Sequence, residues 1–110
     1  DNDNMSALIA GKIKADLLII LTNVDGLFDK PPNDKGAVLI NEVKNINKKI
    51  ESMGSNPSNL GIGGMKAKIQ AAKKATGAGT AAIIANGRKN NVLIDIITGK
   101  NIGTFFYPKK

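Results

Sequence analysis

The sequence contains no cysteine, no histidine and no tryptophan among its 110 residues. Without cysteine the chain has neither a thiol nucleophile nor a disulfide. Without histidine it lacks the side chain that most often carries acid–base catalysis near neutral pH. The usual zinc ligands are missing for the same reason, and we assign no metal-ligating residue. The chemistry open to this chain therefore relies on carboxylates, lysines, hydroxyls and backbone groups.

Aromatic residues make up only 4% of the chain, whereas 42% of its residues are hydrophobic. We therefore expect an aliphatic core. The scarcity of aromatic residues also argues against binding of single-stranded nucleic acids, because proteins that bind single strands stack the bases on aromatic side chains. Only Phe28, Phe105, Phe106 and Tyr107 are available for such stacking.

The net charge of +7 is distributed unevenly. Residues 1–34 carry six acidic residues against three lysines, a balance of −3, and residues 35–110 carry thirteen basic residues against three acidic ones, a balance of +10. A basic half attracts nucleotide phosphates or RNA. A basic RNA-binding module is therefore an alternative, but we expect no nucleic-acid partner because stacking side chains are few.

No apolar stretch in the sequence approaches the ~20 residues that a transmembrane helix needs. The apolar run over residues 17–21 is far shorter. The opening Asp1-Asn2-Asp3-Asn4 is polar and acidic, unlike a signal peptide. A length of 110 residues corresponds to at most one small domain. We expect a cytoplasmic protein without a membrane association.

The hydrophobic pattern alternates between helical and extended periodicity. It predicts helices over residues 4–15, 46–53, 65–76 and 92–98, and strands over residues 17–22, 37–40, 80–85 and 102–107. The continuous apolar run over residues 17–22 is typical of a strand buried on both faces of a parallel sheet. This alternation predicts an α/β fold, a three-layer α-β-α sandwich with a mainly parallel sheet.

Residues 61–68 read Gly-Ile-Gly-Gly-Met-Lys-Ala-Lys. Glycines let the backbone approach a ligand closely, and the following amphipathic pattern places them at a helix N-terminus. Unpaired N–H groups and the helix dipole favour an anion such as phosphate at that position. Lys68 falls in the first turn, where its ammonium can reach the same anion. A flexible linker in front of a helix is the alternative interpretation.

Two further polar segments come at the ends of predicted strands. Thr22-Asn23-Val24-Asp25-Gly26 ends the first apolar strand, and Asn86-Gly87-Arg88 follows the strand over residues 80–85. Ligands of open α/β sheets bind outside the carboxyl ends of the strands. Asp-Gly and Asn-Gly are also favoured turn pairs, so each segment alone is explained by an ordinary turn. Together with the glycine-rich loop they favour a nucleotide site.

Five segments resemble a known family in their order and spacing. They are Asp1-Asn2-Asp3-Asn4-Met5-Ser6-Ala7-Leu8, residues 17–26, residues 61–68, Ala85-Asn86-Gly87 and Gly103-Thr104-Phe105. The chain resembles the C-terminal half of the kinase domain of glutamate 5-kinases, which belong to the amino acid kinase family with its carbamate kinase-like fold. The Asp-Asn-Asp-Asn opening, the Gly-Gly-Met-x-x-Lys loop and the Gly-Thr-Phe ending are the features most particular to glutamate 5-kinases.

This resemblance implies phosphoryl transfer from ATP, with Mg²⁺, to the side-chain carboxylate of L-glutamate at the start of proline biosynthesis. It implies that Lys68 stabilises the transferring phosphoryl group, that Asp3 orients the catalytic lysines and that Asn2 binds glutamate. The nucleotide-binding positions that it implies are Thr22, Asn23, Ile62, Gly63, Gly64, Met65, Lys66, Ala67 and Lys68. Asp3 has a helix cap as its alternative role. A kinase of the same fold that acts on acetylglutamate, aspartate or UMP is the alternative function.

The resemblance also implies parts that lie outside this sequence. The family's kinase domain has an N-terminal half with its own Lys and Gly pair, and some members carry a PUA domain downstream. Residues 1–110 are therefore expected to be the C-terminal, nucleotide-binding part of one kinase domain, with little activity of its own. Asn23 and Ile62 stand where some members have Asp and Thr, which puts the nucleotide affinity in question. The family further implies a homo-oligomer with feedback inhibition by proline.

Overall fold

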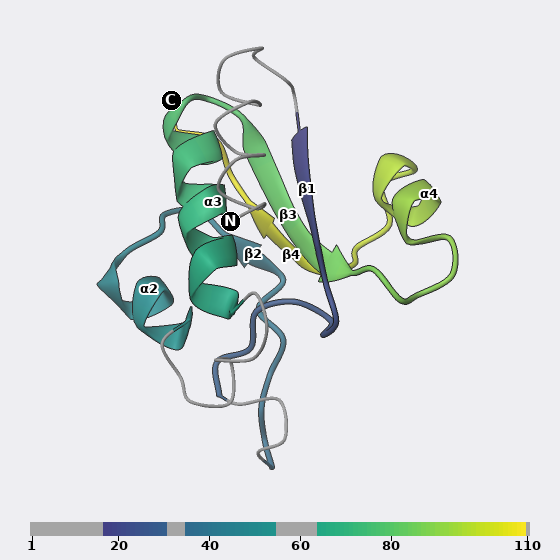
Figure 1. The fold of residues 1–110 in the computed structure, drawn as a ribbon, viewed down its shortest axis with the longest axis horizontal. Coiled ribbons are helices and arrows are strands. Elements are labelled where there is room, and N and C mark those ends of the chain that lie inside the picture. Colours follow the sequence, from purple (N-terminus) through teal and green to yellow (C-terminus); the bar gives the residue numbers. More distant parts are fainter. Residues whose placement is uncertain (1–16, 31–34, 55–63, 110) are drawn as a thin grey trace.

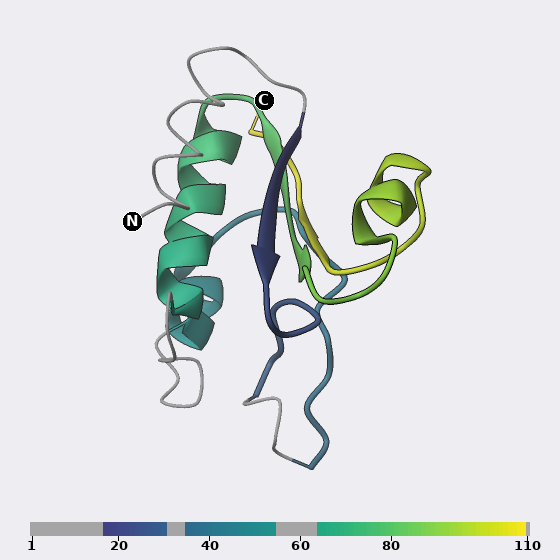
Figure 2. The ribbon, with the colours of Figure 1, turned by 45° about the vertical axis from the view of Figure 1, so that its right-hand side comes forward.

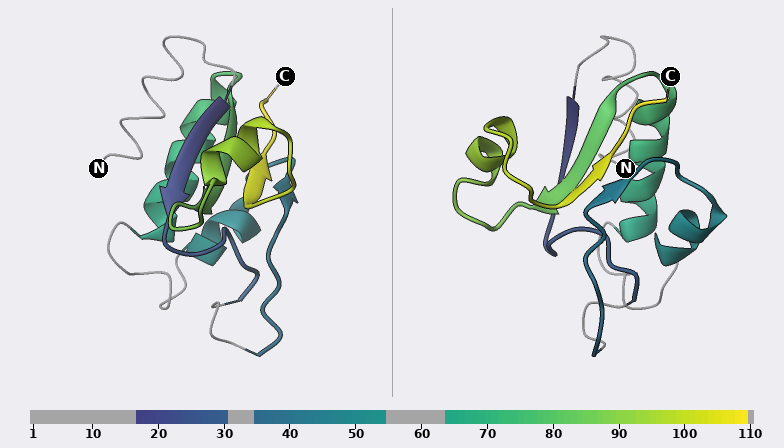
Figure 3. Two further views of the ribbon diagram at one scale, coloured as in Figure 1. Left: turned by 90° about the vertical axis from the view of Figure 1, so that its right-hand side faces the viewer. Right: turned by 180° about the vertical axis from the view of Figure 1, so that it is seen from behind.

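The computed structural model describes residues 17–30, 35–54 and 64–109. In this part of the chain, helices cover both faces of a central sheet (Figure 1 and Figure 2). Helices α2 (Lys48–Gly54) and α3 (Met65–Gly77) lie on one face, and α4 (Val92–Ile97) lies on the other. The view from behind in Figure 3 shows the same three layers. The predicted α-β-α architecture is confirmed.

The sheet of the described residues is mixed and mostly parallel. Its strands are β1 (Leu17–Thr22), β2 (Glu42–Val43), β3 (Ala81–Asn86) and β4 (Thr104–Phe106), in the order β1-β3-β4-β2. β1 and β3 pair in parallel, from Leu17 opposite Ala81 to Thr22 opposite Asn86. β2 is parallel to β4, whereas β3 and β4 are antiparallel. The sheet therefore agrees with the prediction of a mainly parallel arrangement.

The larger hydrophobic cluster lies between α3 and the sheet. On α3 the inward face consists of Ile69 and three alanines that are fully buried, Ala71, Ala72 and Ala75. They pack with one face of the sheet, which contributes Leu18, Ile20, Ala82, Ile84 and Phe106. The small alanine side chains let the helix lie close to the sheet. Burial of a side chain such as Ile69 stabilises the fold by about 1.5–3 kcal/mol.

A smaller cluster lies between α4 and the opposite face of the sheet. It contains Ile83 and Ala85 of β3 together with Val92 and Ile96 of α4. Successive residues of a strand point to opposite faces, so β3 alternates between the two clusters. Consequently β3 is buried on both faces, from its first residue to Ala85.

The first strand is less buried than its apolar sequence predicts. Leu18 and Ile20 are buried, but Leu17 and Ile19 are half-buried and Leu21 is 43% exposed. Within the described residues β1 lies at one end of the strand order, whereas β3 has a strand on each side. The prediction that residues 17–22 are buried on both faces is therefore wrong, and β3 occupies that central place.

The strand predicted over residues 37–40 is replaced by a short two-stranded ribbon. Ile40 donates its N–H to the carbonyl of Leu27 at 2.8 Å, and Asp29 donates its N–H to the carbonyl of Val38 at 3.1 Å. The segment thus pairs with the chain that has just left β1. The strand β2 begins two residues later, at Glu42, where pairing with β4 sets in.

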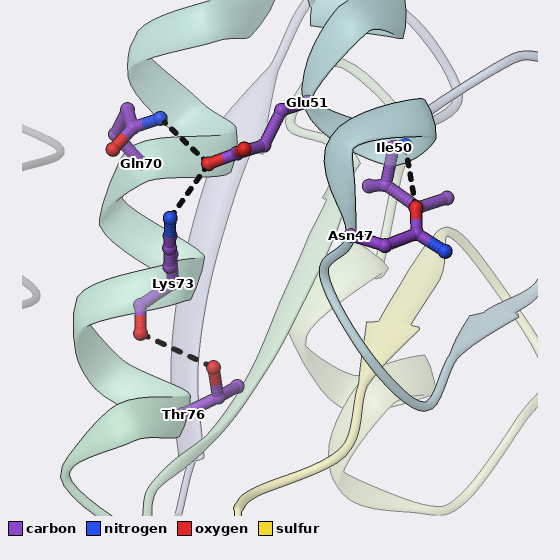
Figure 4. A network of polar contacts seen from close by, with 6 residues as sticks. All are labelled: Asn47, Ile50, Glu51, Gln70, Lys73 and Thr76. Carbon is purple, nitrogen blue, oxygen red and sulfur yellow. Dashed lines mark hydrogen bonds and ion pairs between the residues drawn. The ribbon is translucent and has the colours of Figure 1, made fainter.

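The helix boundaries agree with the predictions to within two residues. α2 starts at Lys48 because the side-chain oxygen of Asn47 accepts the N–H of Ile50 at 3.0 Å, a normal N-cap (Figure 4). α3 and α4 begin at the predicted residues and end at Gly77 and Ile97. None of the helices in the described ranges is long and apolar enough to span a membrane. The helix predicted over residues 4–15 lies outside these ranges.

Candidate functional site

One edge of the sheet brings together the polar segments that the sequence singled out. β1 and β3 both end there, at Thr22 and Asn86, which are register partners. The N–H of Gly87 donates to the carbonyl of Thr22 at 2.8 Å and links the two ends. α3 begins at this same edge, since it runs antiparallel to β3 (Figure 1, lower edge). Two strand ends and a helix N-terminus therefore lie together, as the nucleotide-site interpretation requires.

Asp25 connects the segments that follow β1 and β3. Its carboxylate accepts a hydrogen bond from Asn86 Nδ2 at 3.2 Å and lies 3.1 Å from Lys89 Nζ. The hydrogen bond from Asn86, and next the one from Lys89, lower the pKa of Asp25 below the usual 3.8. Asn86 Oδ1 also accepts the N–H of Arg88 at 2.9 Å. The two segments are thus one connected network rather than independent turns.

Lys89 is a member of this network that the sequence interpretation missed. It lies far from Asp25 along the chain, and no local pattern marks it among the other lysines of the basic half. Only the parallel pairing of β1 with β3 brings the two side chains together.

The start of α3 is suited to an anion. Gly64 is its N-cap, with φ of 26° and ψ of 141°, and as a glycine it has no side chain to occupy the first N–H groups of the helix. α3 has no acidic residue in its first turn, so no carboxylate of its own offsets the positive end of the helix dipole. Lys66 is exposed in the same turn. Each of these features favours phosphate.

Lys68 lies on the inward side of α3. Its residue is only 7% exposed, close to the 5% of Met65 and the 1% of Ile69. Burial of a lysine is costly unless its ammonium has polar partners, while its methylene stem packs readily on apolar groups. The side chain therefore lies against the body of the protein at the helix start and does not extend into solvent.

α2 packs against α3 and contacts it from its first turn to its middle. The carboxylate of Glu51 accepts hydrogen bonds from Lys73 Nζ at 2.8 Å and from Gln70 Nε2 at 3.4 Å (Figure 4). The contact with Lys73 lowers the pKa of Glu51 below its usual 4.5. At the end of α2, a Cβ on Gly54 would lie 2.9 Å from the Cα of Lys66. Only glycine permits this approach, which fixes the position of the first turn of α3.

The described residues include seven of the predicted nucleotide-binding positions. Thr22 is half-buried at the end of β1 and Asn23 is exposed after it. The other five form the cap and first turn of α3, Gly64, Met65, Lys66, Ala67 and Lys68. Asn2, Asp3, Ile62 and Gly63 lie outside the described residues, and their roles stay predictions, as do those of the seven described positions. In the described part of the chain, no three or more Asp, Glu, His or Cys side chains form a group that could hold a metal ion.

A sequence model of the amino acid kinase family matches residues 1–86. The chain belongs to the amino acid kinase family. Within the family, glutamate 5-kinase of Methanosarcina barkeri is 48% identical over the whole of this chain, which covers 29% of that enzyme. Glutamate 5-kinase of Clostridium acetobutylicum is 48% identical over 99% of the chain, which covers 42% of that enzyme. The resemblance to glutamate 5-kinases is confirmed, and the chain spans less than half the length of these relatives.

Solved structures of the amino acid kinase family share the fold. Carbamate kinase from Giardia lamblia bound to AMP-PNP matches with a TM-score of 0.73 and 24% identity, over 99% of this chain and 36% of that one. Uridylate kinase from Archaeoglobus fulgidus matches with a TM-score of 0.69 and 24% identity, over 94% of this chain and 45% of that one. At such identity the likeness concerns the fold alone, and it confirms the predicted carbamate kinase-like architecture.

Proposed function

We propose that this chain is the C-terminal, nucleotide-binding part of the kinase domain of a glutamate 5-kinase. The observation that carries the proposal is the 48% identity over the whole chain with an enzyme of that name. The geometry supports it, because two strand ends and a helix start suited to phosphate share one edge. In the complete enzyme this edge holds ATP, and L-glutamate is the acceptor.

The proposed reaction is an in-line phosphoryl transfer. A side-chain carboxylate oxygen of glutamate forms a bond to the γ-phosphorus of ATP, while the bond from that phosphorus to the oxygen it shares with the β-phosphate breaks. The products are L-glutamyl 5-phosphate and ADP. The acceptor is already an anion, so no general base is needed, which suits a chain without histidine. Such a reaction depends mainly on positioning and on positive charge around the phosphoryl oxygens.

The start of α3 supplies both requirements in this proposal. Backbone N–H groups after Gly64 bind phosphate oxygens, and Lys68 stabilises the charge on the transferring group. Thr22 and Asn23 contact the nucleotide from the end of β1. Ile62, Gly63, Met65, Lys66 and Ala67 complete the phosphate-binding loop, Asp3 orients the catalytic lysines and Asn2 binds glutamate.

Mg²⁺ supplies charge neutralisation on the phosphates of ATP. It prefers oxygen ligands and keeps several waters, so phosphate oxygens and water can provide most of its coordination. Because no cluster of carboxylates is found in the described ranges, the proposal names no protein ligand for the ion.

Exchange of Lys68 tests the proposal. For this test the corresponding segment of the Clostridium acetobutylicum enzyme, to which the chain is 48% identical, is replaced by the chain. The resulting chimera is expressed in a host that lacks glutamate 5-kinase. We expect growth without added proline. Lys68→Met keeps most of the buried stem and removes the charge, so it should lower kcat by about 100-fold or more and leave the KM for glutamate nearly unchanged.

The matched control is Lys74→Met, because Lys74 is exposed in the last turn of the same helix. It should leave kcat unchanged. A folded chimera that does not phosphorylate glutamate would refute the proposed function. An active chimera with the same kcat in Lys68→Met would reduce Lys68 to a structural residue.

A separate experiment tests the proposal that the catalytic groups are divided between this chain and the other half of the kinase domain. The 110-residue chain alone should bind ATP in a calorimetric titration but show little or no turnover, because the proposal assigns the second catalytic lysine and much of the glutamate pocket to the other half of the domain. Turnover at the level of ordinary kinases would contradict it. The proposal further includes a cytoplasmic homo-oligomer that proline inhibits, which light scattering and inhibition assays on the complete enzyme would examine.

A further inference from the structure

A single buried hydroxyl joins three segments close to the candidate nucleotide site. It belongs to Thr104, the fully buried first residue of β4. Thr104 Oγ1 accepts the N–H of Leu27 at 2.9 Å and donates its proton to the carbonyl of Ile40 at 2.6 Å. One hydroxyl therefore satisfies a donor from the chain leaving β1 and an acceptor from the chain entering β2.

The approach of the chain to Thr104 is sterically tight. A Cβ on Gly26, which has φ of 153°, would lie 2.8 Å from Thr104 Oγ1 and 3.0 Å from Leu39 Cδ1. Leu27, the next residue, is fully buried. A side chain at position 26 would push the chain away from the hydroxyl, so Gly26 and Thr104 fit together as a pair.

The segment that Thr104 holds is the turn over residues 23–27, directly after Thr22. Asp25 ties the middle of this turn to Asn86, the last residue of β3, and to Lys89 beyond that strand. The hydroxyl of Thr104 ties its far end to β4 through Leu27. Hydrogen bonds therefore hold the turn at two places, at Asp25 and at Leu27. A loop that is ordered before binding loses less conformational entropy when a ligand binds.

We propose that Thr104 is a positioning residue for nucleotide binding, whose hydroxyl keeps the turn over residues 23–27 in the shape that presents Thr22 and Asn23 to ATP. Thr104 acts through Leu27 and Ile40, because it is itself fully buried. The inference rests on the proposed nucleotide site and adds to it a residue to which the sequence interpretation gave no role.

Two variants separate the hydroxyl from the shape of the side chain. Thr104→Val keeps the branched shape and removes the hydroxyl, whereas Thr104→Ser keeps the hydroxyl and removes a methyl group. In the chimera described above, Thr104→Val should raise the KM for ATP about tenfold, the equivalent of one lost hydrogen bond. The KM for glutamate and kcat should stay within about twofold, and Thr104→Ser should stay near the wild type in all three.

The control for general destabilisation is Thr76→Val. Thr76 is also buried, its hydroxyl donates to the carbonyl of Lys73 at 3.3 Å, and it lies in the last turn of α3, at the opposite edge of the sheet. Loss of this hydroxyl should leave the KM for ATP unchanged. An equal rise in Thr76→Val and Thr104→Val would refute a positioning role.

Hydrogen exchange at the Leu27 amide provides a readout that does not depend on activity. We expect exchange at least about tenfold faster in Thr104→Val and nearly unchanged in Thr104→Ser, since the hydroxyl is the acceptor for this amide. Unchanged protection in Thr104→Val would overturn the inference. An inactive wild-type chimera would refute the proposed function, whereas an active chimera with an unchanged KM for ATP in Thr104→Val would refute this inference alone.

Discussion

Among the described glycines other than Gly64, Gly103 has the least room for an added carbon. Gly103 immediately precedes β4 and has φ of 72°. A Cβ at this position would lie 2.3 Å from the carbonyl oxygen of Ile84 in β3, and 3.1 Å and 3.2 Å from Cβ and Cα of Ala85. The nearest obstacle is backbone in the central strand of the sheet, which cannot rotate away as a side chain would.

Gly99 provides the matched control for the magnitude. It too has a positive φ, 86°, but a Cβ there would have no neighbour within 4 Å. Both alanine variants carry the conformational cost of a left-handed residue, about 1–2 kcal/mol. Gly103→Ala adds a steric overlap, and overpacking costs about 1–3 kcal/mol. We therefore expect Gly103→Ala to destabilise the fold by about 2–5 kcal/mol and Gly99→Ala by about 1–2 kcal/mol.

Thermal and urea unfolding of purified Gly103→Ala and Gly99→Ala measure this difference in the free energy of unfolding. The two variants differ by the steric contribution of about 1–3 kcal/mol, so at about 4–8 °C per kcal/mol for a domain of this size Gly103→Ala should melt roughly 4–24 °C below Gly99→Ala. A destabilisation of this extent is a large fraction of the roughly 5–15 kcal/mol that stabilise a whole domain. Equal melting temperatures would mean that β3 and β4 do not approach as closely as the structure shows, and would refute the steric argument.

The two remaining predictions concern α4 and the edge of the sheet at which β1 and β3 end. Ile96→Ala should lower the free energy of unfolding by about 2–4 kcal/mol because Ile96 is 9% exposed, whereas Ile97→Ala should change it by less than about 0.5 kcal/mol because Ile97 is 76% exposed. Equal losses in urea titrations would show that the outer face of α4 is also covered. Because the folded-state pKa of Asp25 is lowered, its contribution to stability is present above pH 3.8 and is lost as the pH falls through that lowered value. Asp25→Asn should flatten the pH dependence of unfolding below pH 3.8, and superimposable curves for variant and wild type would contradict the network with Asn86.

Elements whose periodicity is local could be predicted from the sequence. α3 alternates apolar and polar residues with helical spacing, and its structure starts at the predicted Met65 and ends one residue late. β3 is a continuous apolar run, and it lies buried at the centre of the sheet. In both cases the pattern records which side chains must leave water, and this information is contained in a short stretch of chain.

Contacts that join distant segments could not be predicted in this way. The apolar pattern predicts a strand over residues 37–40, but in the structure residues 38–40 pair with residues 27–29 in a short ribbon. Four apolar residues in a row do not specify the segment with which they pair. The last strand was predicted two residues too early, since Gly103 turns the chain with a positive φ before β4 begins. The hydrogen bonds of Thr104 join residues separated by more than sixty positions in the chain.

The sequence by itself determined the order of the elements, the glycine-rich entry into α3 and the family, since all three reside in residue types and short spacings. The tertiary structure alone decided that Asp25 meets Asn86 and Lys89, and that Thr104 holds the turn after β1. The physical reason is strand pairing. The parallel pairing of β1 with β3 places their two ends side by side, and the antiparallel pairing of β4 with β3 brings Thr104 opposite Ile84, so polar groups from distant segments become neighbours. Buried donors and acceptors must then be satisfied by whatever the fold brings near them, and no local pattern records that choice.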